Sequence, residues 1–444
     1  MQKTPRSARL QIAILGRRNA GKSSLINALT NQDIALVSDV PGTTADPVYK
    51  AMEIPPIGPV TLIDTAGIDD IGELGLLRAE KTWRVLEKVD LAVLVIDAAS
   101  GIGAPERSVM ERLRAMDVEG VRDSAGSVGD GDPGTFDDTQ DIKHSKCAGR
   151  PGDRRRAGDV PVVVVANKID LAPQAPVKEW EDTLGTEITE VSSQTGEGIE
   201  KVKERIIACA PTDWEGPSLT GDLVSRGDIV ILVTPLDIEA PKGRLILPQV
   251  QTIRDLLDNN VRVMVVKEDA VGESIKEFKV PPDLVITDSQ VFGTVSKQVP
   301  PDVRLTSFSI IFARHKGDLA TLAAGARHVA NLKPGSRVLI AEACTHHPVG
   351  DDIGRVKIPR WLEKHVGGKL DFSWTSGTGF PSDLKDFDLV VHCGGCMVTR
   401  REMLRRIAQV RQAGVPIVNY GVLIAYLHGI MERALKAFKE AGIS

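Results

Sequence analysis

The sequence predicts an α/β protein of three domains, and three observations carry the prediction. Short apolar segments typical of strands alternate with segments of helical periodicity along most of the 444 residues. A Gly-rich loop joins the first such strand to a helix. Toward the C-terminus, strands and helices alternate as in a doubly wound sheet, and cysteines and histidines follow two of the strands. We expect domains at residues 8–211, 218–268 and 269–444.

Composition describes a globular chain with material for several cores. Hydrophobic residues make up 42% and charged residues 26% of the sequence. The net charge of −5 and the aromatic content of 4% argue against a nucleic-acid-binding surface. The polar N-terminus lacks the features of a signal peptide, and no apolar run has the length of a transmembrane helix. We therefore expect a cytoplasmic protein that binds neither nucleic acid nor membrane.

The first domain opens with a phosphate-binding loop. The strand 10–15 leads into Gly-Arg-Arg-Asn-Ala-Gly-Lys-Ser at 16–23, and a helix follows at 24–29. In this pattern backbone N–H groups surround phosphate oxygens, a lysine reaches the β- and γ-phosphates, and a serine hydroxyl binds Mg²⁺. Lys22 and Ser23 take these two roles here. The expected phosphate contacts are Gly16, Asn19, Ala20, Gly21, Lys22, Ser23 and Ser24.

Further motifs in the same order predict a guanine nucleotide. Asp64 ends the strand 60–63 at the place of a carboxylate near Mg²⁺, and Asp170 follows the strand 162–166. Asp170 can accept hydrogen bonds from the N1–H and 2-amino groups of guanine, which adenine lacks. The remaining expected contacts are Thr43 and Thr44 for the γ-phosphate and Mg²⁺, Gly67, Asn167 and Lys168, and Ser192 and Ser193 at the base. GTP and Mg²⁺ are the predicted ligands.

On these motifs, residues 10 to about 210 resemble the Era and TrmE group of GTPases. The resemblance implies that Asn19 helps to bind a K⁺ ion that replaces an arginine finger. Ile68 stands where Ras-type enzymes carry a water-positioning glutamine, and a hydrophobic side chain cannot orient water. We therefore expect slow, K⁺-stimulated GTP hydrolysis, with Lys22, Asn19 and Thr44 as the catalytic residues.

Two segments depart from a simple domain pattern. Residues 119–159 are rich in Gly, Asp, Ser and Arg, and we expect a disordered surface insertion there. The middle segment predicts one βαβ unit, with strands at 229–233 and 261–266 around a helix at 248–259. Such a unit of about fifty residues buries too little surface to be stable alone. We favour self-association into one larger sheet, with packing on the third domain as the alternative.

The third domain alternates strands and helices again, and cysteines follow two of its strands. The expected strands are 284–287, 337–341, 389–391 and 416–419, and the expected helices are 318–330, 399–413 and 422–439. Cys344 comes shortly after one strand, and Cys393 and Cys396 come after another. Because ligands of parallel sheets gather at the carboxyl ends of the strands, three thiolates would meet if these two strands are neighbours.

Three thiolates in a reduced protein predict a metal or cluster site. Zinc would use the three cysteines and one histidine, whereas a [4Fe-4S] cluster would use the three cysteines and leave one iron open. The residue types alone do not separate these two. His346 and His392 stand beside the cysteines, either as a fourth ligand or as hydrogen-bonding neighbours, whereas His347 and His365 fall outside the motif.

The Cys-x-His and His-Cys-x-x-Cys elements, joined to an N-terminal GTPase, resemble the [FeFe]-hydrogenase maturation GTPases of the HydF type. The resemblance covers the whole chain except the insertion. It implies a GTPase domain, a dimerisation domain and an iron–sulfur cluster domain with Cys344, Cys393 and Cys396 as ligands of a [4Fe-4S] cluster. It also implies a homodimer that carries the two-iron precursor of the hydrogenase active site, with two radical-SAM maturases and apo-[FeFe]-hydrogenase as partners.

An alternative is a ribosome- or tRNA-associated GTPase of the TrmE and Era type with a zinc-stabilised C-terminal domain. A third interpretation is a redox enzyme that uses the cluster for electron transfer. The first alternative expects a colourless zinc protein that binds RNA. The acidic balance and the absence of a basic, aromatic RNA-binding segment in the sequence favour the cluster carrier.

Overall fold

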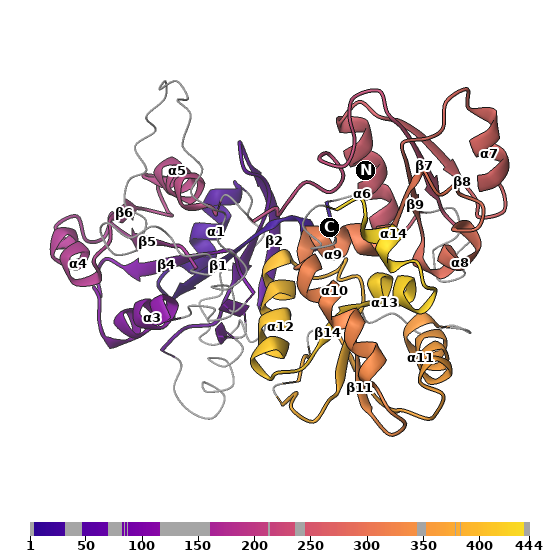
Figure 1. The fold of residues 1–444 in the computed structure, drawn as a ribbon. Coiled ribbons are helices and arrows are strands. Elements are labelled where there is room, and N and C mark those ends of the chain that lie inside the picture. Colours follow the sequence, from indigo (N-terminus) through magenta and orange to yellow (C-terminus); the bar gives the residue numbers. More distant parts are fainter. Residues whose placement is uncertain are drawn as a thin grey trace, which may run out of the picture. The chain divides into compact units, whose positions relative to one another are not determined.

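The computed structural model describes residues 4–31, 47–69, 82–83, 85–86, 88–115, 160–211, 214–235, 245–343, 352–377, 379–381 and 383–438. The chain divides into two compact units, Met1–Glu215 and Gly216–Ser444 (Figure 1). Thr43, Thr44, the insertion 119–159, Cys344, His346 and His347 lie outside the described residues. None of the helices in the described ranges has the length and apolar character needed to cross a membrane.

The first unit is built on a sheet that has six strands within the described residues. The strands are β1 (Leu10–Gly16), β2 (Val48–Ile54), β3 (Gly58–Asp64), β4 (Leu91–Asp97), β5 (Val162–Asn167) and β6 (Ile188–Val191). Their order is β2-β3-β1-β4-β5-β6, and all neighbours are parallel except β2 with β3. The chain adds β3 on one side of β1 and β4 on the other. The strand order therefore reverses at β1, where open α/β sheets bind ligands.

Helices cover both faces of this sheet. They are α1 (Lys22–Thr30), α3 (Ala104–Ala115), α4 (Val177–Leu184) and α5 (Ile199–Cys209). Leu25 of α1 and Val202 of α5 pack with Val93 in one core cluster, whereas Met110 of α3 and Trp180 of α4 belong to the cluster on the opposite face. The buried runs of β1, β4 and β5 are continuous because each of these strands is covered on both faces.

The second unit contains two parallel sheets. The first comprises β7 (Ile229–Val233), β8 (Arg262–Val266), β9 (Leu284–Thr287) and β10 (Arg304–Ser307), in the order β10-β9-β7-β8. The sequence analysis expected one βαβ unit and assigned the strand 284–287 to the third domain. That grouping is wrong, because β9 pairs in parallel with β7, and β10 pairs with β9. The larger sheet solves the burial problem that a fifty-residue unit would have.

The second of these sheets carries the cysteine segment. It comprises β11 (Arg337–Glu342), β12 (Asp371–Ser376), β13 (Leu389–His392) and β14 (Ile417–Asn419), in the order β12-β11-β13-β14. The helices of the unit are α6 (Leu247–Asp258), α7 (Val271–Glu277), α8 (Phe292–Val295), α9 (Phe308–Lys316), α10 (Leu319–Arg327), α11 (Ile358–Val366), α12 (Arg400–Gln412), α13 (Tyr420–Leu427) and α14 (Met431–Leu435). Short 3₁₀ segments and a π-helical turn at Ile353–Lys357 complete the elements.

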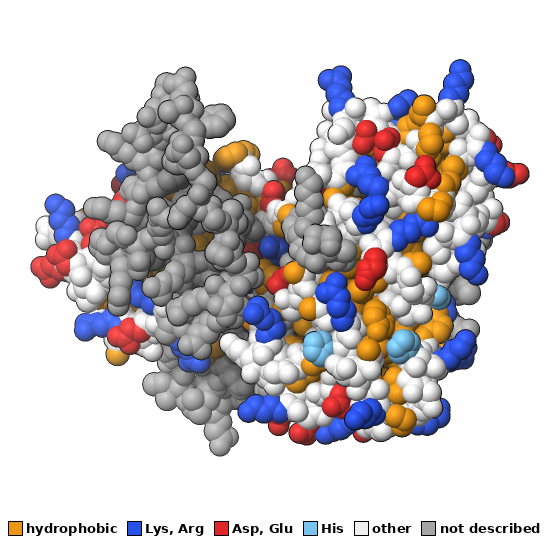
Figure 2. Space-filling view, in the orientation of Figure 1, with side chains coloured by type: hydrophobic (Ala, Val, Ile, Leu, Met, Phe, Trp, Pro, Cys, Tyr) orange, Lys and Arg blue, Asp and Glu red, His pale blue; other side chains and the backbone are white. Residues whose placement is uncertain are grey.

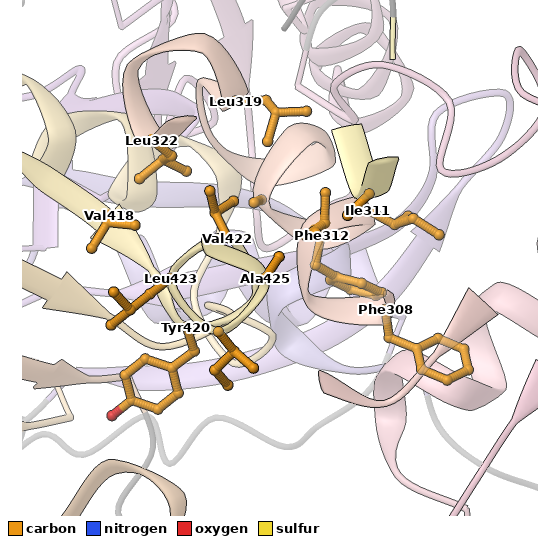
Figure 3. Packing of buried hydrophobic residues seen from close by; sticks show 14 of the residues in the cluster. Phe308, Ile311, Phe312, Leu319, Leu322, Val418, Tyr420, Val422, Leu423 and Ala425 are labelled. Atoms are coloured by element: carbon orange, nitrogen blue, oxygen red, sulfur yellow. The ribbon is translucent and has the colours of Figure 1, made fainter. Parts of the chain in front are cut away.

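One hydrophobic core joins the two sheets of the second unit. Phe308 and Phe312 of α9 pack in the same cluster as Leu322 of α10, Val418 of β14 and Leu423 of α13. Figure 3 shows these side chains converging from the different helices and the strand. The middle segment therefore packs on the third domain, which was the less favoured of the two expectations.

The C-terminal helix is shorter than the sequence pattern predicts. We expected one helix over 422–439, but α13 ends at Leu427 and α14 begins at Met431. Gly429 lies between them with a φ of 71°, in the left-handed region that glycine adopts readily after a helix. The helical periodicity continues across the break, so hydrophobic spacing alone does not reveal it.

Candidate functional site

The phosphate-binding loop is closed around its own lysine. Lys22 is 8% exposed, and its Nζ donates to the carbonyls of Gly16 and Arg17 at 3.0 and 2.8 Å. Asn19 and Gly21 have φ angles of 61° and 88°. Left-handed residues in a loop that precedes a helix N-terminus form the concave N–H surface that binds phosphate. The loop between β1 and α1 thus has the shape expected of a phosphate site.

The position expected for Mg²⁺ holds a buried carboxylate beside a serine hydroxyl. Ser23 Oγ donates to Asp64 Oδ2 at 2.6 Å, and Asp64 is 4% exposed. The other oxygen, Oδ1, is buried and has no hydrogen-bond partner within the described part of the chain. Burial raises the pKa of Asp64 above its ordinary value. An orphaned carboxylate oxygen next to a hydroxyl fits a hard cation such as Mg²⁺.

Lys50 is a neighbour of this position that sequence reasoning missed. It is 8% exposed on β2, and its Nζ lies 3.4 Å from Asn27 Oδ1 of α1. Burial lowers the pKa of Lys50, and the charge of Asp64 opposes that effect. Strand alternation could have found it, because Lys50 shares the inward face of β2 with Ile54.

Asn167 ties the base side of the site to the phosphate loop. Its Nδ2 donates to the Ala20 carbonyl at 3.0 Å, and its Oδ1 accepts from Ser193 N and Oγ at 3.0 and 2.9 Å. Lys168 forms a 2.7 Å ion pair with Asp97 of β4. Asp170 is exposed in the turn that follows. The structure therefore brings the phosphate loop, Asp64, Asn167 and Ser193 together at the carboxyl ends of the central strands.

Ile68 is held against the start of the phosphate loop. Its backbone N–H donates to the Gly16 carbonyl at 3.2 Å, and its side chain packs against the core cluster on the α3 face. The next residue, Asp69, accepts a 2.8 Å hydrogen bond from the Arg18 N–H through Oδ1. The hydrophobic side chain thus has a packing role in this arrangement.

The cysteine segment follows β13 at the carboxyl end of the C-terminal sheet. β11 and β13 are hydrogen-bonded parallel neighbours, which is the condition that the sequence analysis set for the cysteines to meet. Cys393 Sγ accepts the Ala343 N–H at 3.1 Å, and Ala343 directly follows β11. Burial raises the pKa of the Cys393 thiol to about 11, and burial also raises the pKa of Cys396. Gly395 turns between them with a φ of 65°.

A buried lysine from α9 braces this turn, and the sequence analysis did not single it out. Lys316 is 3% exposed, and its Nζ donates to the carbonyls of Cys396 and Val398 at 3.0 and 2.7 Å. Burial lowers the pKa of Lys316 to about 8, although the nearby Cys396 and Cys393 act in the opposite direction. No sequence motif marks a lysine that approaches from a helix some eighty residues earlier.

His392 is fully buried and uses both ring nitrogens. Nδ1 lies 2.8 Å from the Cys393 carbonyl, and Nε2 lies 3.1 Å from Arg406 Nη1. A carbonyl accepts and a guanidinium donates, so the ring is neutral with its proton on Nδ1. Burial lowers the pKa of His392 to about 4. Arg406 is held by Glu402 at 2.8 Å. With both nitrogens engaged, His392 is better suited to hold the Cys393 backbone in place than to bind a metal, which the sequence had left open.

Two of the three expected cysteine ligands are thus placed. Among the residues that the structure describes, no group of three or more His, Cys, Asp or Glu side chains has the arrangement of a metal site. Cys344 and His346 lie outside the described residues, so the described part contributes Cys393 and Cys396 only. Two thiols, a donated backbone N–H and a buried ammonium are a donor set that suits an anionic metal–sulfur group.

Comparison with protein families decides what this combination of domains is. A model described as the hydrogen maturase F dimerization domain matches residues 219–317, and one described as its tetramerization domain matches residues 320–437. A third, the 50S ribosome-binding GTPase, matches residues 11–121. The chain belongs to the hydrogenase maturation GTPases of the HydF type. It is a GTPase that binds GTP and Mg²⁺, and the family's two named domains support an oligomer.

Curated proteins that resemble this chain outside the dimerization and tetramerization domains do so in the GTPase domain alone. The chain is 37% identical over 205 residues to the tRNA modification GTPase MnmE of Thiobacillus denitrificans, covering 45% of this chain and 34% of that protein. It is 42% identical over 105 residues to MnmE of Chromobacterium violaceum, covering 23% of each chain. The chain therefore spans about a third or less of these relatives.

Solved structures with a similar arrangement include a point variant of Aquifex aeolicus Era bound to GDP·AlF₄⁻, at 20% identity and a TM-score of 0.33. The similarity covers 61% of this chain and 98% of that one. The G domain of the T. maritima FeoB iron transporter has 22% identity and a TM-score of 0.28, covering 45% and 97%.

Proposed function

We propose that this family member is a GTP-regulated carrier that binds a [4Fe-4S] cluster through Cys344, Cys393 and Cys396. Its cargo is the two-iron precursor of the [FeFe]-hydrogenase active site, which it receives from radical-SAM maturases and delivers to apo-hydrogenase. The observation that carries the proposal is the pairing of β11 with β13. Because parallel neighbours end at the same edge of a sheet, the residues that follow these strands share one site.

The environment of the two placed thiols supports iron–sulfur binding over zinc. A structural zinc site is closed by four side-chain ligands, and His392 is the candidate fourth ligand that the described residues contain. Both of its nitrogens are engaged by Arg406 and by the Cys393 carbonyl. The Ala343 N–H that reaches Cys393 Sγ is the kind of donor that tunes cluster sulfurs. A cluster with three cysteine ligands keeps one iron open for an exchangeable group, which suits a carrier.

At the other end of the chain, we assign the catalytic roles to Lys22, Asn19 and Thr44. Lys22 stabilises charge on the β- and γ-phosphates, and Thr44 completes the Mg²⁺ shell with Ser23. The packed side chain of Ile68 leaves the positioning of water to other groups. A K⁺ ion bound with the help of Asn19 supplies the missing positive charge. Equal turnover in matched K⁺ and Na⁺ buffers would remove K⁺ from this account.

We propose that the carrier forms a homodimer through the dimerization domain. β8 is an edge strand of its sheet within the described residues, and Val265 on it is 44% exposed. Figure 2 shows hydrophobic side chains among basic and acidic ones on the face where Figure 1 labels β8 and α7. An uncovered edge with apolar side chains pairs readily with a second copy. We therefore assign the homodimer contact to β8.

Anaerobic reconstitution tests the proposed function directly. The protein would be incubated with iron and sulfide, and the EPR spectrum of the reduced wild type would be compared with that of Cys344→Ser. Cys147→Ser is the matched control, because Cys147 lies outside the proposed ligand set. We expect a [4Fe-4S] signal in the wild type and the control, and loss or strong change in Cys344→Ser. A colourless zinc protein that takes up no iron would overturn the proposal and favour the ribosome- or tRNA-directed alternative.

A further inference from the structure

Lys316 ends α9, immediately before the cysteine domain begins. The dimerization-domain match ends at residue 317, and the tetramerization-domain match starts at 320. From this place the side chain reaches residues 393–398, which we call the cysteine turn. There its ammonium donates to the Cys396 carbonyl at 3.0 Å and to the Val398 carbonyl at 2.7 Å. With 3% of its surface exposed, Lys316 is nearly as buried as the hydrophobic core around it.

The charge of this lysine is not balanced by a carboxylate among the described residues. No ion pair to Lys316 occurs within the described ranges, and its two hydrogen bonds go to neutral carbonyls. An ammonium has three N–H donors, so one remains for a further acceptor. Burying an unpaired charge is strongly unfavourable. A cation is therefore retained at this depth most readily when an anion lies beside it.

The groups that face Lys316 across the turn identify the anion. Lys316 donates to the Cys396 carbonyl itself, and the nearby Cys396 and Cys393 thiols raise its pKa against the effect of burial. Of the other cations near this turn, Arg400 donates through Nη1 to the His315 carbonyl at 2.9 Å, and Arg406 is paired with Glu402 at 2.8 Å. We propose that Lys316 is a positioning residue with two roles. It holds the cysteine turn in place, and its positive charge offsets the negative charge of a thiolate-bound metal–sulfur group. This inference rests on the proposed cluster function.

The same contacts join the cysteine turn to the dimerization domain. Arg400 of α12 forms a hydrogen bond to the C-terminal end of α9 at the His315 carbonyl. Asn419 of β14 contacts the start of α9, where its Nδ2 donates to the Ser309 carbonyl and Oγ at 3.1 Å. Gly394 of the turn also approaches Ser309, since a Cβ there would lie 3.4 Å from its Oγ. The turn is therefore supported along the length of α9, and Lys316 is the charged part of that support.

Two substitutions separate the charge of Lys316 from its hydrogen bonds. Lys316→Met removes both, whereas Lys316→Gln keeps an N–H donor and removes the charge. In full-length protein reconstituted anaerobically, we would measure the cluster's reduction potential by EPR-monitored titration and the rate of iron loss to a chelator. Arg433→Met is the matched control, because Arg433 also donates to buried-loop carbonyls, those of Ser296 and Val299, with no cysteine beside it.

We expect both Lys316 variants to shift the potential to more negative values, because a positive charge stabilises the reduced cluster. Iron loss should be about 10- to 100-fold faster in Lys316→Met, the range for residues that support metal ligands, and slower than that in Lys316→Gln. Arg433→Met should keep the wild-type potential, whatever its effect on thermal stability. These results would support the inference.

The inference fails if the wild type carries a cluster and both Lys316 variants keep its potential and its rate of iron loss. If Lys316→Gln keeps the wild-type potential and only Lys316→Met differs, the claim that the charge of Lys316 offsets the cluster charge is wrong. A wild type that takes up neither iron nor sulfide is a different result, because it overturns the proposed function itself and with it the reason for the lysine.

Discussion

Two loops at opposite ends of the chain are built alike and supported differently. Each follows a buried parallel strand, and in each a buried lysine ammonium donates to two loop carbonyls. Lys22 reaches Gly16 and Arg17, and Lys316 reaches Cys396 and Val398. Lys22, however, belongs to the loop that it braces. Lys316 comes from another helix, 80 residues earlier than Cys396.

This difference separates a self-contained site from a dependent one. The phosphate loop draws its lysine and its helix N-terminus from one continuous segment, and Asn167, Ile68 and Asp69 add hydrogen bonds from outside it. The cysteine turn depends on α9 through Lys316 and on α12 through Arg406, which holds His392. We therefore expect changes at the nucleotide site to act on ligand binding, and changes around the cysteine turn to act also on the stability of the second unit.

The largest expected effect concerns nucleotide choice. We predict that the Asp170 carboxylate accepts from the guanine N1–H and 2-amino groups. Asp170→Asn replaces it with an amide that can donate to the 2-oxo group of xanthine. The preference for GTP over XTP should fall by about 10⁴-fold, because buried polar groups of the base would be left unpaired. Hydrolysis rates with both nucleotides measure it. Asp182→Asn, on the exposed surface of α4, is the control. An unchanged preference would remove Asp170 from the base site.

The next effect tests the dependence of the cysteine turn on α12. Arg406 is 1% exposed and pairs with Glu402 at 2.8 Å. Arg406→Met should lower the free energy of unfolding of the second unit by about 3–5 kcal/mol, because it breaks a buried ion pair with Glu402 and removes the guanidinium donor of the His392 ring. Denaturant unfolding measures the loss.

Arg411→Met, on the exposed side of the same helix, serves as the control for Arg406→Met and should change stability little. GTP turnover should persist in both variants, since the first unit has its own cores. A wild-type unfolding curve for Arg406→Met would show that the turn does not depend on α12.

The smallest effect concerns the edge of the dimerization sheet. Val265→Lys places a charge on β8, and charged residues on edge strands oppose pairing with another chain. Loss of one valine side chain from the proposed dimer contact should weaken the dimer by about tenfold. Sedimentation equilibrium over a concentration series would measure this. Val280→Lys changes a valine that is 58% exposed and lies outside β8, so it should leave the dimer intact. Equal effects of the two substitutions would place the contact elsewhere.

Local signals account for what the sequence predicted well. The α/β class and the three-domain content are confirmed. One continuous sequence motif predicts the strand, loop and helix formed by β1 and α1. β7 and β9 lie where their apolar runs predict them. The pairing of β11 with β13 met the condition that the cysteine hypothesis required.

Contacts between distant segments account for the rest. Nothing in residues 284–287 says that this strand pairs with β7, so its grouping with the third domain was wrong. Lys316 and Arg406 were not singled out because a buried cation on a helix has no pattern of its own, and only its tertiary partners identify it. Lys50 was missed although the alternation along β2 places it on the inward face. The break at Gly429 was missed because helical spacing continues across it.

The central claim is that one chain combines a GTPase with a cysteine-bound cluster, and that GTP hydrolysis itself does not require the cluster. The measurement that tests it most directly is iron and acid-labile sulfide content, with the GTP hydrolysis rate, on the same anaerobically reconstituted samples of wild type and Cys396→Ser. We predict about one cluster per chain in the wild type, loss of most of it in Cys396→Ser, and GTP turnover within about twofold between them. Equal iron and sulfide in the two proteins, or a wild type that binds only zinc, would contradict the account.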